Sequence, residues 1–317
     1  MASITAAICT YNRYDLLPKA IDSVLEQTLT NDYRVMVVDN SPANPRGKEL
    51  EAEFQSSPKL TYRIEPTPGI SNARNVAARE CGTELIAYLD DDAIASETWL
   101  SEVCAAFDLF GDKAAVVGGR IDPIWSAPRP HWLPDEMLGL LTVLDWGGQC
   151  RPLGPKEWVA GANISFRVTP LLEIGGFQTN LGRLGAGHVL LSSEETQVVE
   201  ALTGRGHDVI WAPHAKVSHL VDKRRLERKW LRSRTAWQAV SDFIRDADQA
   251  VEKQPAYWNA LRRYFNALPP RLRNPNGFFE DFEDPQQFQQ QVDSFYNMVM
   301  LLLLGANISE AQLERDA

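Results

Sequence analysis

The chain has 317 residues, of which 44% are hydrophobic and 23% charged, and its formal net charge is −10. Such a composition is typical of a globular protein with a substantial core, built as one large domain or as one domain with an appendage. The acidic balance argues against broad nucleic-acid binding. We expect a cytoplasmic protein, because the cysteines are scattered, no signal peptide is recognised and the apolar runs are short.

Apolar segments with strand and helix periodicity alternate through the first part of the chain. Strands are expected at 4–10, 33–39, 60–64, 84–89 and 114–117, and helices at 17–25, 71–81 and 97–110. This alternation predicts an α/β fold with a mostly parallel sheet and helices on both faces.

The pattern breaks between Asp122 and Pro155, in a segment rich in Pro and Trp that we interpret as an irregular, substrate-facing excursion. Beyond it we expect regular structure at 157–168, a helix from about residue 192, and strands at 208–212 and 215–219. The rest of the chain has a helical pattern. We therefore predict a catalytic domain at 1–222 and a helical C-terminal region at 223–317.

The stretch 84–94 (ELIAYLDDDAI) is an apolar strand pattern that ends in Asp90, Asp91 and Asp92. Three adjacent carboxylates repel one another unless a cation lies among them. Mg²⁺ and Mn²⁺ take oxygen ligands and commonly share them with a substrate phosphate. Open α/β sheets also bind their ligands at the carboxyl ends of the strands. The alternative is a solvated acidic turn that ends the strand.

Polar residues also follow the first two expected strands. The first strand ends in the run from Thr10 to Arg13, in which Tyr11 could stack on a nucleobase, and the second ends at Asp39, which could accept a ring N–H. Arg74 lies in the first turn of a helix, where phosphate or a base carbonyl could bind. Taken singly, Tyr11 is more often a core residue and Asp39 a helix or turn cap, but their joint placement at the edge that holds Asp90 favours function. The alternative for Arg74 is an ordinary surface arginine.

The ordered motifs CTYNR, VVDN, GISNARN, YLDDD, GANISFR and GGF…LGRLG…SSEET span roughly residues 3–220. In this order and spacing the chain resembles a family 2 glycosyltransferase of the GT-A fold. The resemblance implies a nucleotide-sugar donor, most often a UDP-sugar, with a divalent metal, Mn²⁺ or Mg²⁺, on its diphosphate. It also implies inverting transfer to a hydroxyl of a glycan or lipid-linked glycan, as in polysaccharide biosynthesis.

The resemblance further implies roles for individual residues. Nucleotide-binding positions are Thr10, Tyr11, Asn12, Arg13, Asp39, Arg74, Asp90 and Asp91. Asp92 matches the metal carboxylate, and His219 matches a histidine that reaches the metal or diphosphate. The donor-sugar and acceptor positions are Gly161, Ala162, Asn163 and Trp158, with Trp211 as a further ring for stacking. A bulged strand would equally explain the glycine, and a core role the tryptophans.

The catalytic base is where the sequence departs from the family pattern. The family places an Asp at the head of a helix after a Gly-rich loop, here LGRLGAG at 181–187, and this chain has Glu195 at that position. Glu195 could act as the base that deprotonates the acceptor. Alternatively, Ser192 and Glu195 could form a capping box that starts the helix, leaving Glu194 as the acceptor-facing acid.

Seven basic residues lie between Lys223 and Arg234 in this acidic chain. On a helix, the opposite, buried face would hold Leu226, Trp230, Trp237 and Val240. The basic residues would then form a solvated face, a loop that closes Arg224 or Arg225 over the donor diphosphate, or a peripheral contact with the inner face of a membrane.

Two other classes of function stay open at this stage. An inactive donor-binding scaffold of polysaccharide assembly would fit the missing Asp at the base position. A sugar nucleotidyltransferase would need a Gly-rich phosphate loop after the first strand, where this chain has CTYNR. The sequence leaves the sugar, the acceptor, the linkage and the oligomeric state undetermined.

Overall fold

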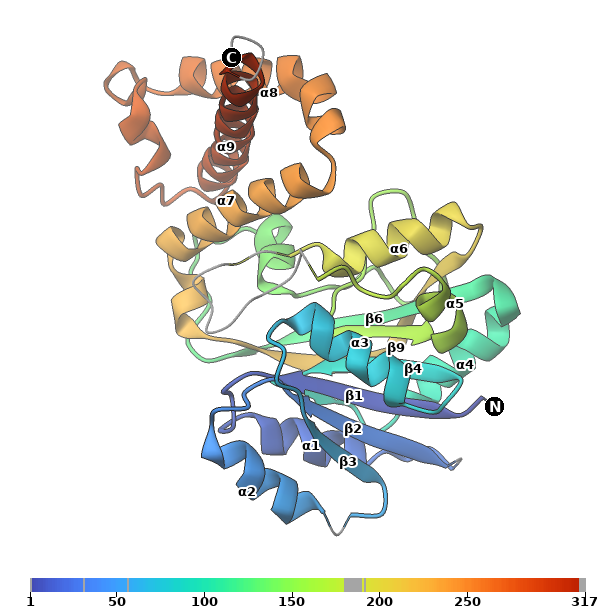
Figure 1. Cartoon of the computed structure of the whole chain (residues 1–317). Coiled ribbons are helices and arrows are strands. Elements are labelled where there is room, and N and C mark those ends of the chain that lie inside the picture. Colours follow the sequence, from blue (N-terminus) through green and yellow to red (C-terminus); the bar gives the residue numbers. More distant parts are fainter. Residues whose placement is uncertain (1, 31, 56, 180–189, 191, 314–317) are drawn as a thin grey trace. The chain divides into compact units, whose positions relative to one another are not determined.

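The structure is a computed structural model that describes residues 2–30, 32–55, 57–179, 190 and 192–313, with side-chain burial described to residue 305. The chain divides into two compact units (Figure 1). Unit 1 comprises Met1–Ile124, Thr142–His188 and Glu194–Leu220, and unit 2 comprises Trp125–Leu141, Val189–Ser193 and Val221–Ala317. The helical unit thus includes part of the Pro- and Trp-rich segment that the sequence assigns to the catalytic domain.

Unit 1 is built around a sheet of nine strands among the described residues, in the order β3-β2-β1-β4-β8-β6-β9-β5, with β7 also paired to β9. The strands are β1 (Ile4–Thr10), β2 (Tyr33–Asp39), β3 (Leu60–Ile64), β4 (Leu85–Asp90), β5 (Ala93–Ala95), β6 (Ala114–Trp125), β7 (Arg151–Pro152), β8 (Asn163–Arg167) and β9 (Asp208–Val221). The first four confirm the strands expected in that part of the chain to within a residue.

The sheet is mixed rather than mostly parallel. β1 runs parallel to β2 and β4, and β2 runs parallel to β3. β8, however, pairs antiparallel with both β4 and β6, and β5 and β7 pair antiparallel with β9. Two neighbouring parallel strands need a crossover connection between them. The long irregular segment between β6 and β8 instead lets the chain enter β8 in the opposite direction, antiparallel to both β4 and β6. Hydrophobic patterns do not encode strand direction, so the expectation of a mostly parallel sheet is corrected to a mixed sheet.

Helices cover both faces of the sheet (Figure 1). On one face lie α1 (Leu17–Leu25), α2 (Pro45–Phe54) and α4 (Trp99–Phe110), and on the other lie α3 (Ile70–Glu80), α5 (Val168–Glu173) and α6 (Glu194–Gly204). Side chains of a strand alternate between the two layers, so Ile8 packs with the first group and Cys9 with the second. Burial on both faces explains why the seven residues of β1 are all buried and nearly all apolar.

Several elements of unit 1, among them β5, β7, α2 and α5, were not expected from the sequence. β5 has three residues and α5 has six, which is too short for a periodic pattern to register. α2 does carry a start signal, because the Asn44 side chain accepts a hydrogen bond from the Arg46 N–H and Pro45 follows at the first helical position. The two strand-like segments at 208–219 form one strand, β9.

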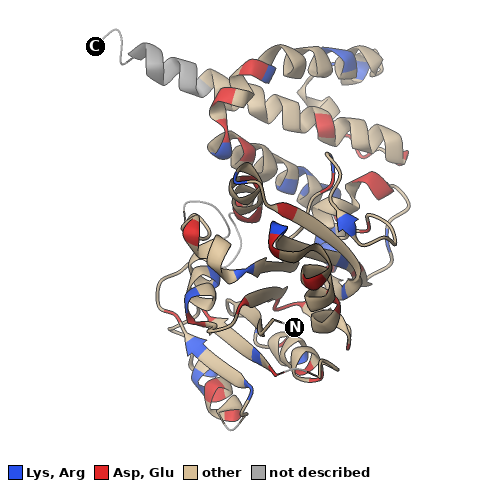
Figure 2. Ribbon diagram, turned by 90° about the vertical axis from the view of Figure 1, so that its right-hand side faces the viewer, with Lys and Arg blue, Asp and Glu red and all other residues tan. Residues whose placement is uncertain are grey.

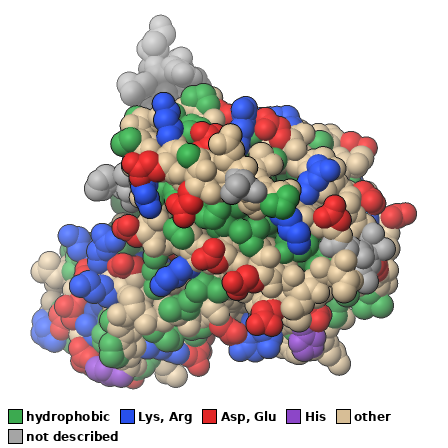
Figure 3. Space-filling model, turned by 90° about the horizontal axis from the view of Figure 1, so that it is seen from below, with side chains coloured by type: hydrophobic (Ala, Val, Ile, Leu, Met, Phe, Trp, Pro, Cys, Tyr) green, Lys and Arg blue, Asp and Glu red, His purple; other side chains and the backbone are tan. Residues whose placement is uncertain are grey.

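Charges of both signs lie between apolar side chains on the face seen in Figure 3.

Unit 2 is helical, as expected. Its helices are α7 (Arg228–Arg245), α8 (Ala247–Ala267) and α9 (Pro285–Leu313), with 3₁₀ turns at Asp135–Leu141, Lys223–Leu226, Pro270–Leu272 and Pro275–Phe278. One apolar cluster centres on Tyr257, Met300 and Leu304, and a second on Tyr264 and Phe278. Among the described helices, none is both long and apolar enough to cross a membrane.

The buried face of α7 differs from the predicted one. Leu231, Thr235 and Ala239 are buried at four-residue spacing, whereas Trp230, Trp237 and Val240 are only partly buried. Nor do the basic residues form one solvated face. Arg228 stacks on Trp132 with its guanidinium carbon 4.2 Å from the ring centroid, and Arg232 is buried against Gln291 and the Glu280 carbonyl. Figure 2 shows Asp and Glu alongside Lys and Arg on these helices.

Candidate active site

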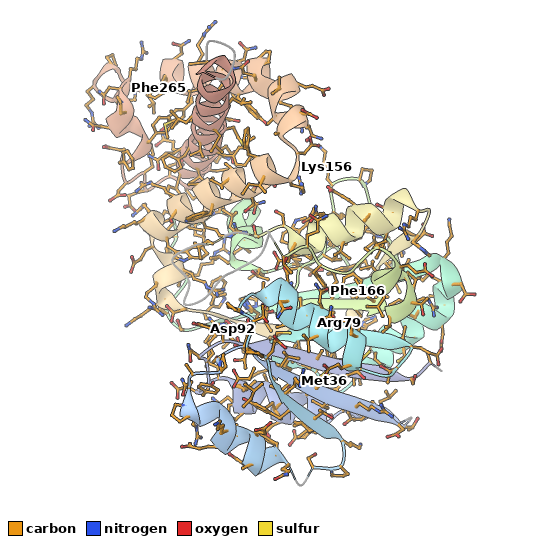
Figure 4. All side chains as sticks on the ribbon, in the orientation of Figure 1. Met36, Arg79, Asp92, Lys156, Phe166 and Phe265 are labelled. Atoms are coloured by element: carbon orange, nitrogen blue, oxygen red, sulfur yellow. The ribbon has the colours of Figure 1, made fainter. Side chains whose placement is uncertain are left out.

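The ends of neighbouring strands bring the predicted donor-side residues to one edge of the sheet. Thr10 at the end of β1 pairs in register with Asp39 of β2, and Cys9 pairs with Asp90 of β4. Asp92 follows at the same edge (Figure 4). This clustering is the consequence of parallel pairing that the motif spacing predicts.

Asp90, Asp92 and His219 form a group of potential metal ligands. One ligand atom from each lies within 4.8 Å of the others, and the His219 Nε2 is 3.2 Å from Asp92 Oδ1. β9 carries His219 to the acids, since this residue pairs with Ala93 of β5, next to Asp92. Two carboxylates and one imidazole suit a divalent cation that accepts both oxygen and nitrogen ligands, and the imidazole favours Mn²⁺ over the strictly oxygen-seeking Mg²⁺. The residues therefore fit the implied metal.

Asp91 is not one of this group and is buried. Its carboxylate accepts hydrogen bonds from Thr10 Oγ1 at 2.7 Å and from Arg13 Nη1 at 2.9 Å. Burial, and secondly the neighbouring Asp92, raise the pKa of Asp91 to about 6, although Arg13 opposes the shift. The same Arg13 nitrogen lies 2.6 Å from Asp92 Oδ2. Arg13 thus offsets the charge of two adjacent carboxylates.

Asp39 is fully buried beneath two tyrosines that the sequence analysis did not single out. Tyr14 and Tyr62 donate hydrogen bonds to its Oδ2 at 2.9 and 2.8 Å, and the Ser41 N–H donates to its Oδ1. A Cβ on Gly47 would lie 2.4 Å from the same Oδ2, so only glycine fits there. Burial is the main cause that raises the pKa of Tyr14 to about 12. No local pattern marks these tyrosines, because the contact depends on the fold.

The turn after β1 has an unusual backbone at Asn12, whose φ of 55° is left-handed. The Asn12 N–H donates to Ser41 Oγ at 2.8 Å, and the Asn12 Oδ1 accepts from Asn44. Tyr11, immediately before it, is half-buried. Side-chain bonds from the β2–α2 connection thus hold this turn, which presents Tyr11 at the sheet edge.

Arg74 of α3 links the donor-side acids to the predicted base region. It is 4% exposed, and its Nη1 lies 2.9 Å from Glu194 Oε1 while its Nη2 lies 3.7 Å from Asp90 Oδ1. Gly161 packs directly against the guanidinium, where an added Cβ would come within 2.2 Å of Nη2. The close approach explains the glycine better than a bulged strand does.

Glu194 and Glu195 begin α6 with different surroundings. Glu194 is buried against Arg74, whereas Glu195 is partly exposed and its Oε1 accepts from the Gly161 N–H at 3.2 Å. Burial, followed by the proximity of Glu195, raises the pKa of Glu194 to about 7. The backbone N–H of Ser192 donates to Ser241 Oγ, so the reciprocal bond of a capping box is absent from the described contacts. The Gly-rich loop at 181–187 lies outside the described residues.

Asn163 and Trp211 do not fit their predicted roles at the sugar. The Asn163 amide donates to the carbonyls of Arg120 and Ala215 and accepts from the Trp99 indole, so both its N–H groups and its oxygen are engaged inside the protein. Trp211 is fully buried with its indole N–H on the Gly147 carbonyl. Both are structural residues. Ala162 is also buried, and Trp158 is 41% exposed.

Arg224 and Arg225, predicted to reach the diphosphate, both belong to unit 2. Arg224 is exposed and pairs with Asp222 at 3.0 Å, whereas Arg225 is buried and lies over the Trp230 ring. Their role at the diphosphate stays a prediction.

Comparison with known proteins gives a consistent assignment. Residues 5–148 match the model of the family described as "Glycosyl transferase family 2". The chain is 30% identical over 294 residues to a glucosyl-dolichyl phosphate glucuronosyltransferase of Haloferax volcanii. This alignment covers 91% of this chain and 90% of the relative. It is 22% identical over 322 residues to a validoxylamine A glucosyltransferase of Streptomyces hygroscopicus subsp. jinggangensis, covering 92% of this chain and 70% of the relative.

Solved structures agree on the fold. The mannosyltransferase PcManGT from Pyrobaculum calidifontis, in complex with GDP-Man and Mn²⁺, aligns with a TM-score of 0.56 at 18% identity, over 98% of this chain and 75% of that one. TarS 1–349 of S. aureus, in complex with UDP, aligns with a TM-score of 0.54 at 15% identity, over 96% and 92% of the two chains. At these identities the likeness establishes the GT-A fold alone.

Proposed function

Since the chain belongs to glycosyltransferase family 2, we propose that it moves a sugar from a nucleoside diphosphate donor to an acceptor hydroxyl with inversion at the anomeric carbon. The observation that carries this proposal is the continuous arrangement from Asp92 and His219 through Asp90 and Arg74 to Glu194. In this proposal a metal-binding end and a carboxylate end would lie on either side of one buried arginine. Inverting transfer needs both, because the leaving group and the attacking hydroxyl occupy opposite faces of the sugar.

The donor side would hold a uridine diphosphate. Asp90, Asp92 and His219 are the proposed ligands of a divalent metal, which when bound would offset the charge that develops on the departing diphosphate. Tyr11, half-buried beside the held turn, is placed to stack on the base. Asp39 would reach the base only after Tyr14 or Tyr62 released its carboxylate, so base binding should be coupled to movement of these tyrosines.

The acceptor side would use Glu195 as the base. Glu194 is tied to Arg74 and buried, so its carboxylate cannot approach an acceptor without breaking that ion pair. Glu195 is the more exposed of the two residues, and its Oε1 accepts only the Gly161 N–H. Its Oε2 is buried without a hydrogen-bond partner among the described residues, as is Oε2 of Glu194, so Glu195 would have to turn toward the acceptor, which no ion pair prevents. We infer that Glu195 takes the proton from the acceptor hydroxyl, while Glu194 positions Arg74 behind the donor.

The relatives indicate which substrates to test first. The Haloferax volcanii relative is a glucuronosyltransferase whose name specifies a dolichyl phosphate-linked glucose. We therefore propose a lipid-linked sugar as the acceptor and a UDP-hexose or UDP-hexuronic acid as the donor. GDP-mannose belongs in the same screen, because PcManGT is solved with it.

A thermal-shift screen of UDP- and GDP-sugars, with and without Mn²⁺, tests the donor. A ligand at 100 times its Kd stabilises the folded state by about 2.7 kcal/mol, which corresponds to roughly 5 to 10 °C for a domain of this size. We expect the largest shift for a UDP-sugar with Mn²⁺. A larger shift with a GDP-sugar would replace uridine in the proposal, and no shift with any nucleotide sugar would refute donor binding.

Release of UDP in the presence of a lipid-linked sugar acceptor then separates an enzyme from a donor-binding scaffold. We expect release that depends on both metal and acceptor. Donor binding without acceptor-dependent release across the acceptor panel would favour the scaffold, for which the Glu in place of Asp at position 195 is the only support in the sequence.

A further inference from the structure

A long cationic stretch lies in unit 2, away from the basic cluster that drew attention in the sequence. Residues 253–279 contain five basic residues and neither Asp nor Glu, in a chain whose net charge is −10. The five are Lys253, Arg262, Arg263, Arg271 and Arg273. Such segregation of charge favours a polyanionic partner.

The exposed side of α8 adds apolar surface to this charge. Val251 and Trp258 are 58% and 54% exposed, although both are large apolar side chains. They lie seven residues apart, two turns of helix, and Arg262 continues the same row four residues later. Tyr257 and Tyr264 lie on the opposite side, buried in the two apolar clusters of the unit. The exposed tryptophan is therefore not needed for the core.

Two arginines near this end of α8 are available to a partner: Arg262 in the row, and Arg263 about 100° around the helix from it. Among the residues that the structure describes, neither Arg262 nor Arg263 has an ion pair, and both are exposed. Arg271, in contrast, pairs with Glu280 at 3.2 Å, and Arg273 donates to the carbonyls of Leu268 and Asn266. We call Val251, Trp258, Arg262 and Arg263 the α8 face.

We propose that the α8 face docks unit 2 on a membrane surface that contains anionic lipid. An aromatic side chain next to unpaired arginines suits the boundary between lipid headgroups and acyl chains. There the indole ring can contact acyl chains while the arginines pair with lipid phosphates. A nucleic acid would use the charge but leave Val251 in water, and an apolar protein groove would leave the arginines unpaired. The proposal goes beyond the transfer reaction and does not require that a lipid-linked acceptor be correct.

Co-sedimentation of the full chain with vesicles tests this directly. We expect binding to phosphatidylcholine vesicles that contain phosphatidylglycerol, little binding to phosphatidylcholine alone, and loss of binding as salt screens the charges. Each arginine near an anionic surface contributes about 1 kcal/mol, so the double variant R262Q/R263Q should weaken partitioning roughly 30-fold. Trp258→Ala should weaken it further at every salt concentration.

Matched controls distinguish the α8 face from general charge and general apolar exposure. Lys156→Gln with Arg205→Gln removes the same charge from exposed positions of unit 1, and Leu109→Ala removes a large exposed apolar side chain from α4. These controls should bind vesicles as the unchanged protein does, and all variants should unfold at the same temperature. Equal binding to neutral vesicles, no binding, or unchanged binding of the α8 variants would overturn the proposal. So would self-association abolished by Trp258→Ala without vesicle binding.

Discussion

Gly161→Ala tests the packing around Arg74 most sharply, because a single methyl group is aimed at one guanidinium. The added Cβ would lie 2.2 Å from Nη2, 2.9 Å from the guanidinium carbon and 3.1 Å from Nη1. Real Cβ atoms essentially never lie under 3.0 Å from a neighbour, so Arg74 or the backbone of residue 161 must move. Either movement disturbs the ion pair between Arg74 and Glu194 and the bond from the Gly161 N–H to Glu195.

The expected magnitude follows from overpacking of a buried site, which costs about 1 to 3 kcal/mol. For a domain of this size we expect the melting temperature to fall by roughly 2 to 10 °C. Turnover should fall as well, because Glu194 and Glu195 both lose a fixed partner. Arg74 lowers the pKa of Glu194, so its displacement should move that pKa above its value of about 7.

Gly148→Ala is the matched control, since a Cβ there would meet nothing within 4 Å and its φ is not left-handed. Both variants can be compared by thermal unfolding and by donor turnover across pH. The reasoning is refuted if Gly161→Ala melts and turns over like Gly148→Ala.

Three further predictions concern the site. Glu195→Gln should cut turnover by roughly 10²- to 10⁴-fold with the donor-induced thermal shift unchanged; near-normal turnover would exclude Glu195 as the base. His219→Ala should reduce the thermal shift given by Mn²⁺ together with donor and leave the shift given by nucleotide without metal, whereas equal loss of both would indicate a structural histidine. Glu194 has a folded pKa raised to about 7 from 4.5, so its stabilising effect is full below about pH 4.5 and is lost as pH rises through 7. Thermal unfolding between pH 4.5 and 8 should therefore show a decline that Glu194→Gln makes smaller, and an unchanged decline would contradict the assignment.

Many of the strands and helices of unit 1 could be predicted from local sequence patterns. The strands from β1 to β4 are buried on both faces and read as apolar runs, and their parallel pairing places Thr10, Asp39 and Asp90 at one edge. The convergence of His219 with Asp92 also follows from the resemblance, since it requires β9 to return beside β5. Asp92 and His219 were thus expected at one metal, whereas Asp90, the third member of the group of potential ligands, was expected at the nucleotide.

Other features depend on contacts that no local pattern encodes. Tyr14 and Tyr62 meet Asp39 from two different elements, and Asn163 is tied to three elements distant in sequence, so its motif position was misleading. The buried face of α7 was misassigned because its packing accepts Thr235 and Ala239 rather than the larger tryptophans. Small residues on a closely packed helix carry little hydrophobic signal.

The central claim is that Asp90, Asp92 and His219 hold a metal that serves a nucleotide-sugar donor. It is tested most directly by the Mn²⁺ dependence of UDP-sugar binding to the unchanged protein and to Asp92→Asn, measured by calorimetry with the same donor. We expect Mn²⁺ to tighten donor binding to the unchanged protein and Asp92→Asn to remove this enhancement. Metal-independent donor binding in the unchanged protein, or a full Mn²⁺ enhancement in Asp92→Asn, would contradict it.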